Sequence, residues 1–186
     1  LNPDISFNTG VMESIVQFME KNQQVGNLMP KIVYPNGNIQ YLCKLLPTPL
    51  DLIIRRFIPI KSLKDKMNES YELRKTNYNS ILNVPNLSGC FMFLRVKSLE
   101  NVGIFDENIF MYLEDVDLNR RIHTKYETIF FPRVDIVHSY AKESYVNKKL
   151  LIYHMKSAIY YFNKWGWIID KFRKKTNNKL KKKFDL

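Results

Sequence analysis

The stretch NIFMYLEDVDLNRR, residues 108–121, decides how the rest of the chain is interpreted. Its first half is apolar and aromatic enough for residues 110–113 to be buried, so the acids Glu114, Asp115 and Asp117 emerge from a core element. A helix that begins near Glu114 would place Glu114 and Asp117 on one face, with Asp115 about a quarter-turn away. Two explanations stay open: acids that offset the exposed N–H groups of any helix start, or acids that do chemistry.

Composition favours a folded protein of one domain or slightly more. The 186 residues are 45% hydrophobic and 13% aromatic, which excludes a disordered chain and allows a real core. No run approaches the roughly 18 uninterrupted apolar residues of a membrane span, and no signal peptide opens the sequence. Cys43 and Cys90 form neither a metal spacing nor a disulfide framework, so we expect reduced core residues in a cytoplasmic protein.

The net charge of +11 is concentrated near the C-terminus. From Lys142 onward, 13 basic residues stand against three acids, which leaves residues 1–141 with a net charge of +1. A nucleic-acid-binding domain more often spreads its basic patch over the folded body. We therefore expect no nucleic-acid partner.

Apolar periodicity and turn residues predict alternating helices and strands. The expected elements are a helix at 8–21 capped by Asn8 or Thr9, a strand at 25–34, a type I′ Asn-Gly turn at 35–38 with a returning strand at 39–43, a buried central strand at 90–94, a helix at 97–101, and strands at 127–131 and 134–138 separated by Pro132. This alternation favours an α/β domain. Residues 44–80 are expected to form a variable insertion with one or two short helices, either a lid or a plain loop.

The segment 145–186 has a helical pattern with a break at Gly166. Its expected apolar stripe consists of Leu151, Met155, Ile159, Phe162 and Ile169. A basic amphipathic helix with interfacial tryptophans suits an anionic membrane surface. A helix docked on the body with a frayed lysine tail is the alternative, and both remain open.

Five short motifs occur in a recognisable order. They are Asn2-Pro3-Asp4, Leu87-Ser88-Gly89-Cys90, VGIFDE at 102–107, EDVDL at 114–118, and His138. Together they resemble the inverting family 2 glycosyltransferases of the GT-A fold, especially the rhamnosyltransferase-like branch that builds bacterial surface polysaccharides. The resemblance implies a partial GT-A (nucleotide-diphospho-sugar transferase) α/β fold with a mixed sheet and C-terminal helices. Residues 1–144 would be its metal, acceptor and catalytic portion, and residues 145–186 a basic helical tail.

The resemblance also implies roles for the acids and for the Ser-Gly pair. Asp115 matches the general base that takes a proton from the acceptor hydroxyl, and Glu114 would orient the acceptor or tune the base. Ser88 and Gly89 would lie where donor and acceptor meet. Asp117 is a further candidate for binding donor or acceptor, although we favour a structural role as the i, i+4 partner of Arg121.

A metal site is implied by Asp4 and His138. Asp4 matches the last acid of the family's metal-binding motif, and His138 matches a histidine that completes the site. Oxygen ligands suit Mg²⁺ or Mn²⁺, which would offset charge on the departing diphosphate. The alternatives are an Asp in a common Asn-Pro-Asp turn and a structural histidine after a strand.

The expected function is transfer of a sugar, with rhamnose from dTDP-rhamnose as the first choice, from a dTDP- or UDP-sugar donor to a lipid-linked or polysaccharide acceptor. We expect this to occur in the cytoplasm, with peripheral attachment to the inner face of the membrane through residues 145–186. Because the family's nucleotide-binding half precedes LNPD, we also expect this chain to lack that half and to be weak or inactive alone. The alternative is a non-catalytic fragment or a module that binds membranes or nucleic acid through its basic tail.

Overall fold

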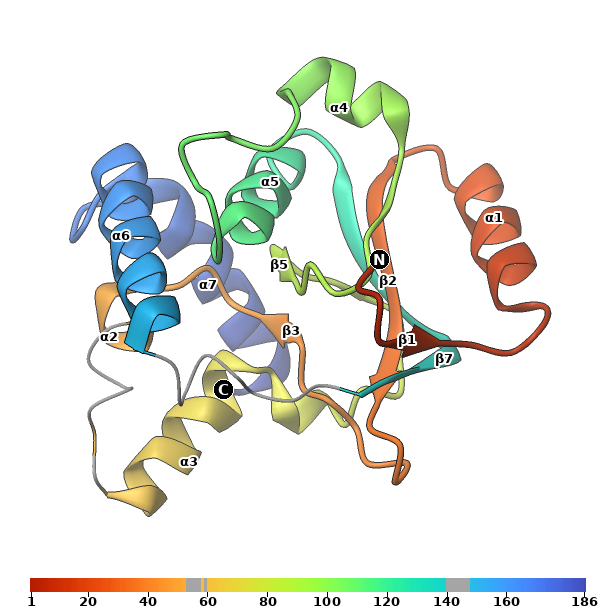
Figure 1. Cartoon of the computed structure of the whole chain (residues 1–186), viewed down its shortest axis with the longest axis horizontal. Helices are drawn as coiled ribbons and strands as arrows, with labels where there is room; N and C mark the ends of the chain where they lie inside the picture. The colour runs from red at the N-terminus through yellow and green to blue at the C-terminus, as the bar shows by residue number, and fades with distance from the viewer. Residues whose placement is uncertain (53–57, 59, 140–147) are drawn as a thin grey trace.

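The computed structural model describes residues 1–52, 58, 60–139 and 148–186 (Figure 1). Its elements, in chain order, are β1 (Ile5–Ser6), α1 (Val11–Lys21), β2 (Val25–Val33), β3 (Cys43–Lys44), α2 (Pro49–Leu52), α3 (Lys61–Tyr71), the 3₁₀ turn η2 (Arg74–Thr76), β4 (Leu82–Asn83), β5 (Asn86–Leu87), β6 (Phe93–Leu94), α4 (Val96–Val102), α5 (Glu114–Ile122), β7 (Glu127–His138), α6 (Lys148–Trp165) and α7 (Lys171–Phe184). Strands and helices alternate, which confirms the α/β prediction.

Within these residues the main sheet has five strands in the order β1-β7-β2-β6, and β4 also pairs with β7. The long pair β2 and β7 is parallel, whereas β1, β4 and β6 join antiparallel. Figure 1 shows this sheet nearly edge-on, with α1 on one side and α5, α6 and α7 on the other. The mixed sheet is consistent with a partial nucleotide-diphospho-sugar transferase fold.

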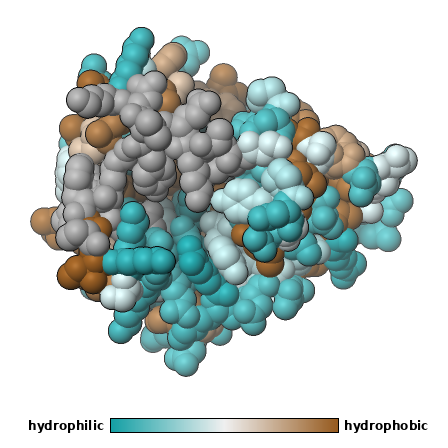
Figure 2. All heavy atoms as spheres, turned by 60° about the horizontal axis from the view of Figure 1, so that its bottom comes forward, coloured by the Kyte–Doolittle hydropathy of each residue, from teal (hydrophilic) through white to brown (hydrophobic). Residues whose placement is uncertain are grey.

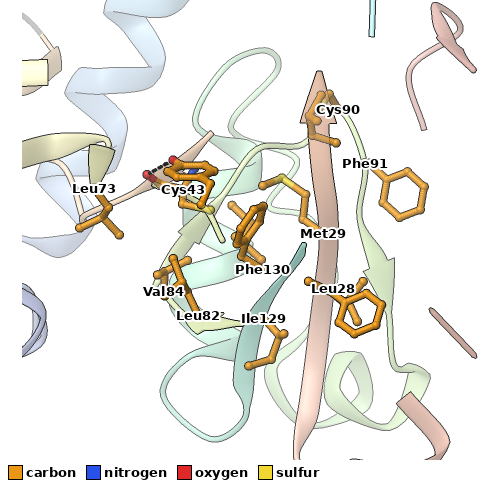
Figure 3. Packing of buried hydrophobic residues seen from close by; sticks show 14 of the residues in the cluster. Leu28, Met29, Cys43, Leu73, Leu82, Val84, Cys90, Phe91, Ile129 and Phe130 are labelled. Atoms are coloured by element: carbon orange, nitrogen blue, oxygen red, sulfur yellow. Dashed lines mark hydrogen bonds between the residues drawn. The ribbon is translucent and has the colours of Figure 1, made fainter. Parts of the chain in front are cut away.

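The core forms around β2, in which every residue except Lys31 is buried. Side chains alternate between the faces of a strand, and Figure 3 shows Met29 with Phe130 on one side of β2 and Leu28 with Phe91 on the other. Both faces of the strand are therefore covered, which explains its nearly continuous apolar sequence. A second cluster joins α5 to α6 through Val116, Ala158 and Phe162, among others.

Two strand predictions differ from the structure. Pro132 does not divide β7, because the chain passes it in a register shift in which Pro30 faces Phe131 while Lys31 faces Asp135. A bulge of this kind accommodates a residue that cannot donate to the ladder. The run 90–94 is not a central strand either: only β6 (Phe93–Leu94) pairs, and it lies at the edge of the sheet.

Two turn predictions also differ. At the Asn-Gly turn only Gly37 has a positive φ, of 82°, so the turn is not type I′, and the returning chain makes a single bridge from Ile39 to Val33. Helix α1 begins at Val11 after Gly10, whose φ is 90°, and no side chain caps it. The predicted apolar stripe is nonetheless buried at Val11, Ile15 and Met19.

The insertion at 44–80 contains short helices, as predicted, and is anchored to the body by Tyr78. The Tyr78 hydroxyl donates to the Cys43 carbonyl at 3.0 Å and accepts from the Cys43 N–H at 2.8 Å. Burial raises the pKa of Tyr78. The part of the insertion at 53–57 and 59 lies outside the described residues.

Helix α7 is docked on the body rather than extended into solvent. The Asn177 side chain accepts from the Leu46 N–H and donates to the Leu46 carbonyl, at 3.0 and 2.8 Å, and Leu180 joins the main core. The predicted stripe is wrong in two places, because Ile159 and Ile169 are 46% and 83% exposed. In the described part of the chain, no helix is long and apolar enough to cross a membrane.

Candidate functional site

Helix α5 presents its first two acids through an unusual turn. Tyr112 and Leu113 have φ values of 64° and 69°, a left-handed conformation that costs energy for residues other than glycine. Leu113 is buried in the cluster between α5 and α6, and this packing holds the turn in place. As a result Glu114 and Asp115 begin the helix at the edge of a pocket.

Asp115 is held against Gly89 of the Ser-Gly motif. Its Oδ2 accepts from the Gly89 N–H at 2.7 Å, and its Oδ1 accepts from the Val116 N–H at 2.8 Å. A Cβ at position 89 would lie 3.0 Å from the Asp115 Cβ, so glycine permits this close approach. Burial raises the pKa of Asp115, while the Gly89 N–H and the Lys44 charge oppose that rise.

Glu114 has a contrasting environment. Its Oε2 is buried and has no hydrogen-bond partner among the described residues. Burial, followed by the neighbouring charge of Asp115, raises the pKa of Glu114 to about 7. The N–H groups of Gly89 and Val116 oppose the rise in the pKa of Asp115, whereas the neighbouring charge of Asp115 adds to the rise at Glu114.

Asp4 and His138 are brought together by the antiparallel pairing of β1 with β7. Ile5 is opposite His138, and the Ser139 N–H donates to the Asp4 carbonyl at 3.1 Å. The Nε2 of His138 then lies 3.4 Å from the Asp4 Oδ2. The Asn2 amide nitrogen is also 3.4 Å from this Nε2.

Gln40 orients the ring of His138. Its Nε2 donates to the His138 carbonyl at 2.7 Å, which directs its Oε1 towards the His138 Nδ1 at 3.0 Å. The other ring nitrogen, Nε2, therefore faces Asp4 and Asn2, and a partner behind the ring is also typical of metal-ligating histidines. No group of three His, Cys, Asp or Glu side chains in metal-binding proximity occurs among the described residues. Protein ligands here would be Asp4, His138 and the Asn2 side chain.

A single pocket of about 850 Å³ connects these features. It is lined by Asn2, Ser88, Gly89, Glu114, Asp115 and His138, together with residues of the insertion. Five of the seven residues predicted from the sequence thus line one pocket, and Asp4 is adjacent through its contact with His138. Segments at 2–4, 88–89, 114–115 and 138 meet here although they are far apart in the chain.

Asp117 does not line this pocket. It is fully buried, and its carboxylate accepts from Arg121 Nε at 2.8 Å, as the i, i+4 prediction requires. Trp165 Nε1 and Lys164 Nζ also reach it, at 2.7 and 2.9 Å. Asp117 therefore does not join the other candidate residues in the pocket, and its contacts include the one expected of the i, i+4 partner of Arg121.

Sequence reasoning missed Gln40, Lys44 and a buried asparagine pair. Asn27 donates to the Asn119 Oδ1 at 2.7 Å, and Asn119 donates to the Leu87 and Asp115 carbonyls at 2.8 and 2.9 Å. This pair ties β2 and the strand before Ser88 to the start of α5. An asparagine inside the otherwise apolar run of β2 was the available signal.

Part of this chain is similar in sequence to known bacterial proteins. Two curated relatives match, both named N-acetylglucosaminyl-diphospho-decaprenol L-rhamnosyltransferase, from the CDC 1551 / Oshkosh and ATCC 25618 / H37Rv strains of Mycobacterium tuberculosis. Each is 25% identical over 142 residues, which cover 74% of this chain and 45% of the relative. The chain therefore spans less than half the length of these relatives. No family model and no solved structure matches it. By this similarity the chain resembles glycosyltransferases.

Proposed function

We propose that this chain carries the acceptor-side and catalytic portion of an inverting glycosyltransferase that uses a nucleotide-sugar donor. One observation carries the proposal: Glu114 and Asp115 share a pocket with His138, and only Asp115 is anchored by a backbone donor from the Ser-Gly motif. Paired carboxylates whose environments separate their pKa values are typical of acid–base sites. The similarity to two rhamnosyltransferases supports the same reaction class.

In the proposed reaction Asp115 is the general base. Its carboxylate takes the proton of an acceptor hydroxyl, whose oxygen forms a bond to the anomeric carbon of the donor sugar. The bond from that carbon to the nucleotide diphosphate breaks on the opposite side, and the diphosphate leaves with the electron pair. Glu114, protonated up to a pH of about 7, would donate a hydrogen bond from its unpartnered carboxyl to the acceptor.

Asp4, His138 and the Asn2 side chain would hold a divalent cation. The Nε2 of His138 lies 3.4 Å from the Asp4 carboxylate, and Gln40 holds the ring from behind, so these side chains could act together as metal ligands. Carboxylate and amide oxygens with one imidazole suit Mn²⁺ or Mg²⁺. When bound, the cation would offset negative charge on the departing diphosphate.

The names of the relatives suggest the substrates. Those proteins are named for rhamnose transfer and for an N-acetylglucosaminyl-diphospho-decaprenol acceptor. For this chain we propose rhamnose from a dTDP donor and a lipid-linked acceptor, with Ser88 and Gly89 at the point where the two substrates meet. Ser88 and Gly89 line the same pocket as Asp115.

The test is sugar transfer by Asp115→Asn. Because a positioned base contributes about 10²- to 10⁴-fold, we expect turnover with dTDP-rhamnose and a prenyl-diphosphate glycan acceptor to fall at least about 100-fold. The melting temperature should stay close to that of the wild type. Asp135→Asn, which changes an exposed acid on β7, is the matched control and should retain full turnover. Equal turnover in Asp115→Asn and the control would refute the proposal.

Ligand binding tests the metal residues separately. dTDP with Mn²⁺ should raise the melting temperature, because a ligand at about 100 times its Kd stabilises the native state by about 2.7 kcal/mol. Asp4→Ala and His138→Ala should each lose the Mn²⁺-dependent part of this shift. A shift that both variants retain would place the diphosphate elsewhere.

A further inference from the structure

The turn between α6 and α7 exposes two large apolar side chains. Ile168 and Ile169 are 90% and 83% exposed, and the neighbouring Trp167 is 38% exposed. Gly166, with a φ of 103°, makes the turn, and a Cβ there would lie 2.5 Å from the Ile169 carbonyl oxygen. Figure 1 shows this turn on the side of the molecule formed by α6 and α7, and Figure 2 shows hydrophobic atoms scattered among hydrophilic ones on another face.

Buried contacts hold the turn in this exposed conformation. The Arg173 guanidinium donates to the carbonyls of Gly166, Trp167 and Ile168, at 3.2, 3.0 and 3.4 Å. The Trp167 ring packs 5.2 Å from Phe162, and its Nε1 donates to the Asn163 side chain. These three carbonyl oxygens already accept hydrogen bonds from Arg173. The turn can therefore enter a less polar environment without leaving them unpaired.

An exposed stripe of α6 leads to this turn. Its members recur at spacings of three and four residues, which places them on one helix face: Lys149, Ile152, Lys156, Ile159 and Asn163. Ile152 and Ile159 are 55% and 46% exposed; Ile152 lies between Lys149 and Lys156, and Ile159 between Lys156 and Asn163. We call this stripe and residues 167–169 together the α6–turn face.

The charge beside the α6–turn face is strongly positive. The exposed basic residues of α7 are Lys171, Lys174, Lys175, Lys179, Lys181, Lys182 and Lys183. Of the acids at 148–186, Asp170 is buried against Arg120, which leaves Asp185 at the end of the helix. Lys171 follows Ile169 by two residues, and Lys174 and Lys175 lie about one helical turn further on, so exposed isoleucines, a tryptophan and lysines occur together, as suits the interface of an anionic bilayer.

We propose that the α6–turn face docks on an anionic lipid surface, with Trp167, Ile168 and Ile169 inserted among the headgroups and the lysines against them. The face carries a net positive charge, so two copies would repel one another. Phosphate backbones of nucleic acid would attract the lysines but would leave the two isoleucines in water. This inference goes beyond the proposed transfer reaction and does not depend on it.

The experiment is co-sedimentation with vesicles of phosphatidylglycerol and phosphatidylcholine in equal parts, compared with phosphatidylcholine alone. We expect binding only to the anionic vesicles, with a blue shift of tryptophan emission that Trp167→Phe removes. Ile168→Asp/Ile169→Asp should weaken binding roughly tenfold or more, because two apolar side chains no longer enter the interface. Both changes are at exposed positions, so the melting temperature should not change.

Matched variants separate the alternatives. Val96→Asp alters a residue of α4 that is 68% exposed, and it should bind as the wild type does. Lys171→Glu/Lys174→Glu should weaken binding to the anionic vesicles, and added salt should do the same. Absence of binding, equal binding to neutral vesicles, or unchanged binding by the isoleucine pair would each overturn the proposal. A dimer in the absence of lipid that the isoleucine variant abolishes would instead identify a second copy as the occupant.

Discussion

Acids of α5 lie in two different surroundings: the pocket, with Glu114 and Asp115, and the region around Asp117, Arg120 and Asp170, which we call the rear side. On the pocket side, Glu114 and Asp115 are close to one another, and burial raises the pKa of both. On the rear side, Asp117 is more deeply buried but accepts from Arg121, Lys164 and Trp165. Three residues along one helix therefore separate a pair of acids that resists ionisation from an acid that is surrounded by donors.

The comparison teaches that burial alone does not identify a functional acid. A buried carboxylate with several cationic and N–H donors is satisfied and structural, as at Asp117. A partly buried carboxyl group with an unpartnered oxygen beside a second acid, as at Glu114, is destabilised in its charged form and open to a ligand. The rear side also holds Arg120, whose guanidinium binds Asp170 through two bonds of 2.6 and 2.8 Å.

Breaking the buried ion pair between Arg120 and Asp170 on the rear side should have the largest effect on stability. Asp170→Asn keeps the α7 cap, which accepts from the Arg173 N–H, but leaves the Arg120 charge buried without its partner. Removing one member of such a pair costs about 3–5 kcal/mol, so urea unfolding should show a loss in this range. Asp185→Asn, at an exposed acid near the end of the same helix, should change stability by less than about 0.5 kcal/mol. Equal effects would show that the pair does not anchor α7.

Adding a side chain at Gly89, beside Asp115, should have an intermediate effect on stability. In Gly89→Ala the new Cβ would lie 3.2 Å from the Asp115 Oδ2, so the carboxylate must shift from the Gly89 N–H. We expect a loss of about 1–2 kcal/mol in the free energy of unfolding, as for other overpacked sites. Ser88→Ala, which removes only a 3.4 Å contact with the Cys90 N–H, should lose less than about 0.5 kcal/mol. If Gly89→Ala leaves the free energy of unfolding unchanged, then the contact with the Gly89 N–H does not fix Asp115.

Replacing Glu114 by a neutral residue should have the smallest effect on stability. The pKa of Glu114 is about 7 in the folded protein against a model-compound value of 4.5, so the folded state binds the proton more tightly. This group therefore lowers stability progressively as the pH rises from about 4.5 to about 7. Glu114→Gln should match the wild type at pH 4 and exceed it at pH 8 by on the order of 1 kcal/mol.

The control for this pH dependence is Glu20→Gln, at an exposed residue of α1. The difference in stability between Glu20→Gln and the wild type should not grow between pH 4.5 and 7. If Glu114→Gln behaves like Glu20→Gln in thermal unfolding at these pH values, then Glu114 is not destabilised on ionisation, and the contrast between the two sides of α5 fails.

Local patterns alone predicted much of the fold. The apolar spacing of α1, the start of α5 at Glu114 and the break at Gly166 follow from side-chain periodicity and from backbone freedom, which are properties of a few neighbouring residues. The i, i+4 pair of Asp117 with Arg121 is local in the same sense. The strand around Pro132 was mispredicted because its parallel partner β2, about 100 residues earlier, absorbs the proline in a register shift.

The candidate site also combines features that the sequence predicts with features that depend on tertiary contacts. The sequence by itself determined which acids, which histidine and which Ser-Gly pair were available, and their order resembled a known family. Only the tertiary structure decided that Asp115 meets Gly89, that Gln40 orients His138, and that Asp117 is enclosed on the rear side. It also decided that Ile168 and Ile169 face outward. The physical reason is that a side chain's pKa, tautomer and exposure depend on partners distant in the chain, which local periodicity does not encode.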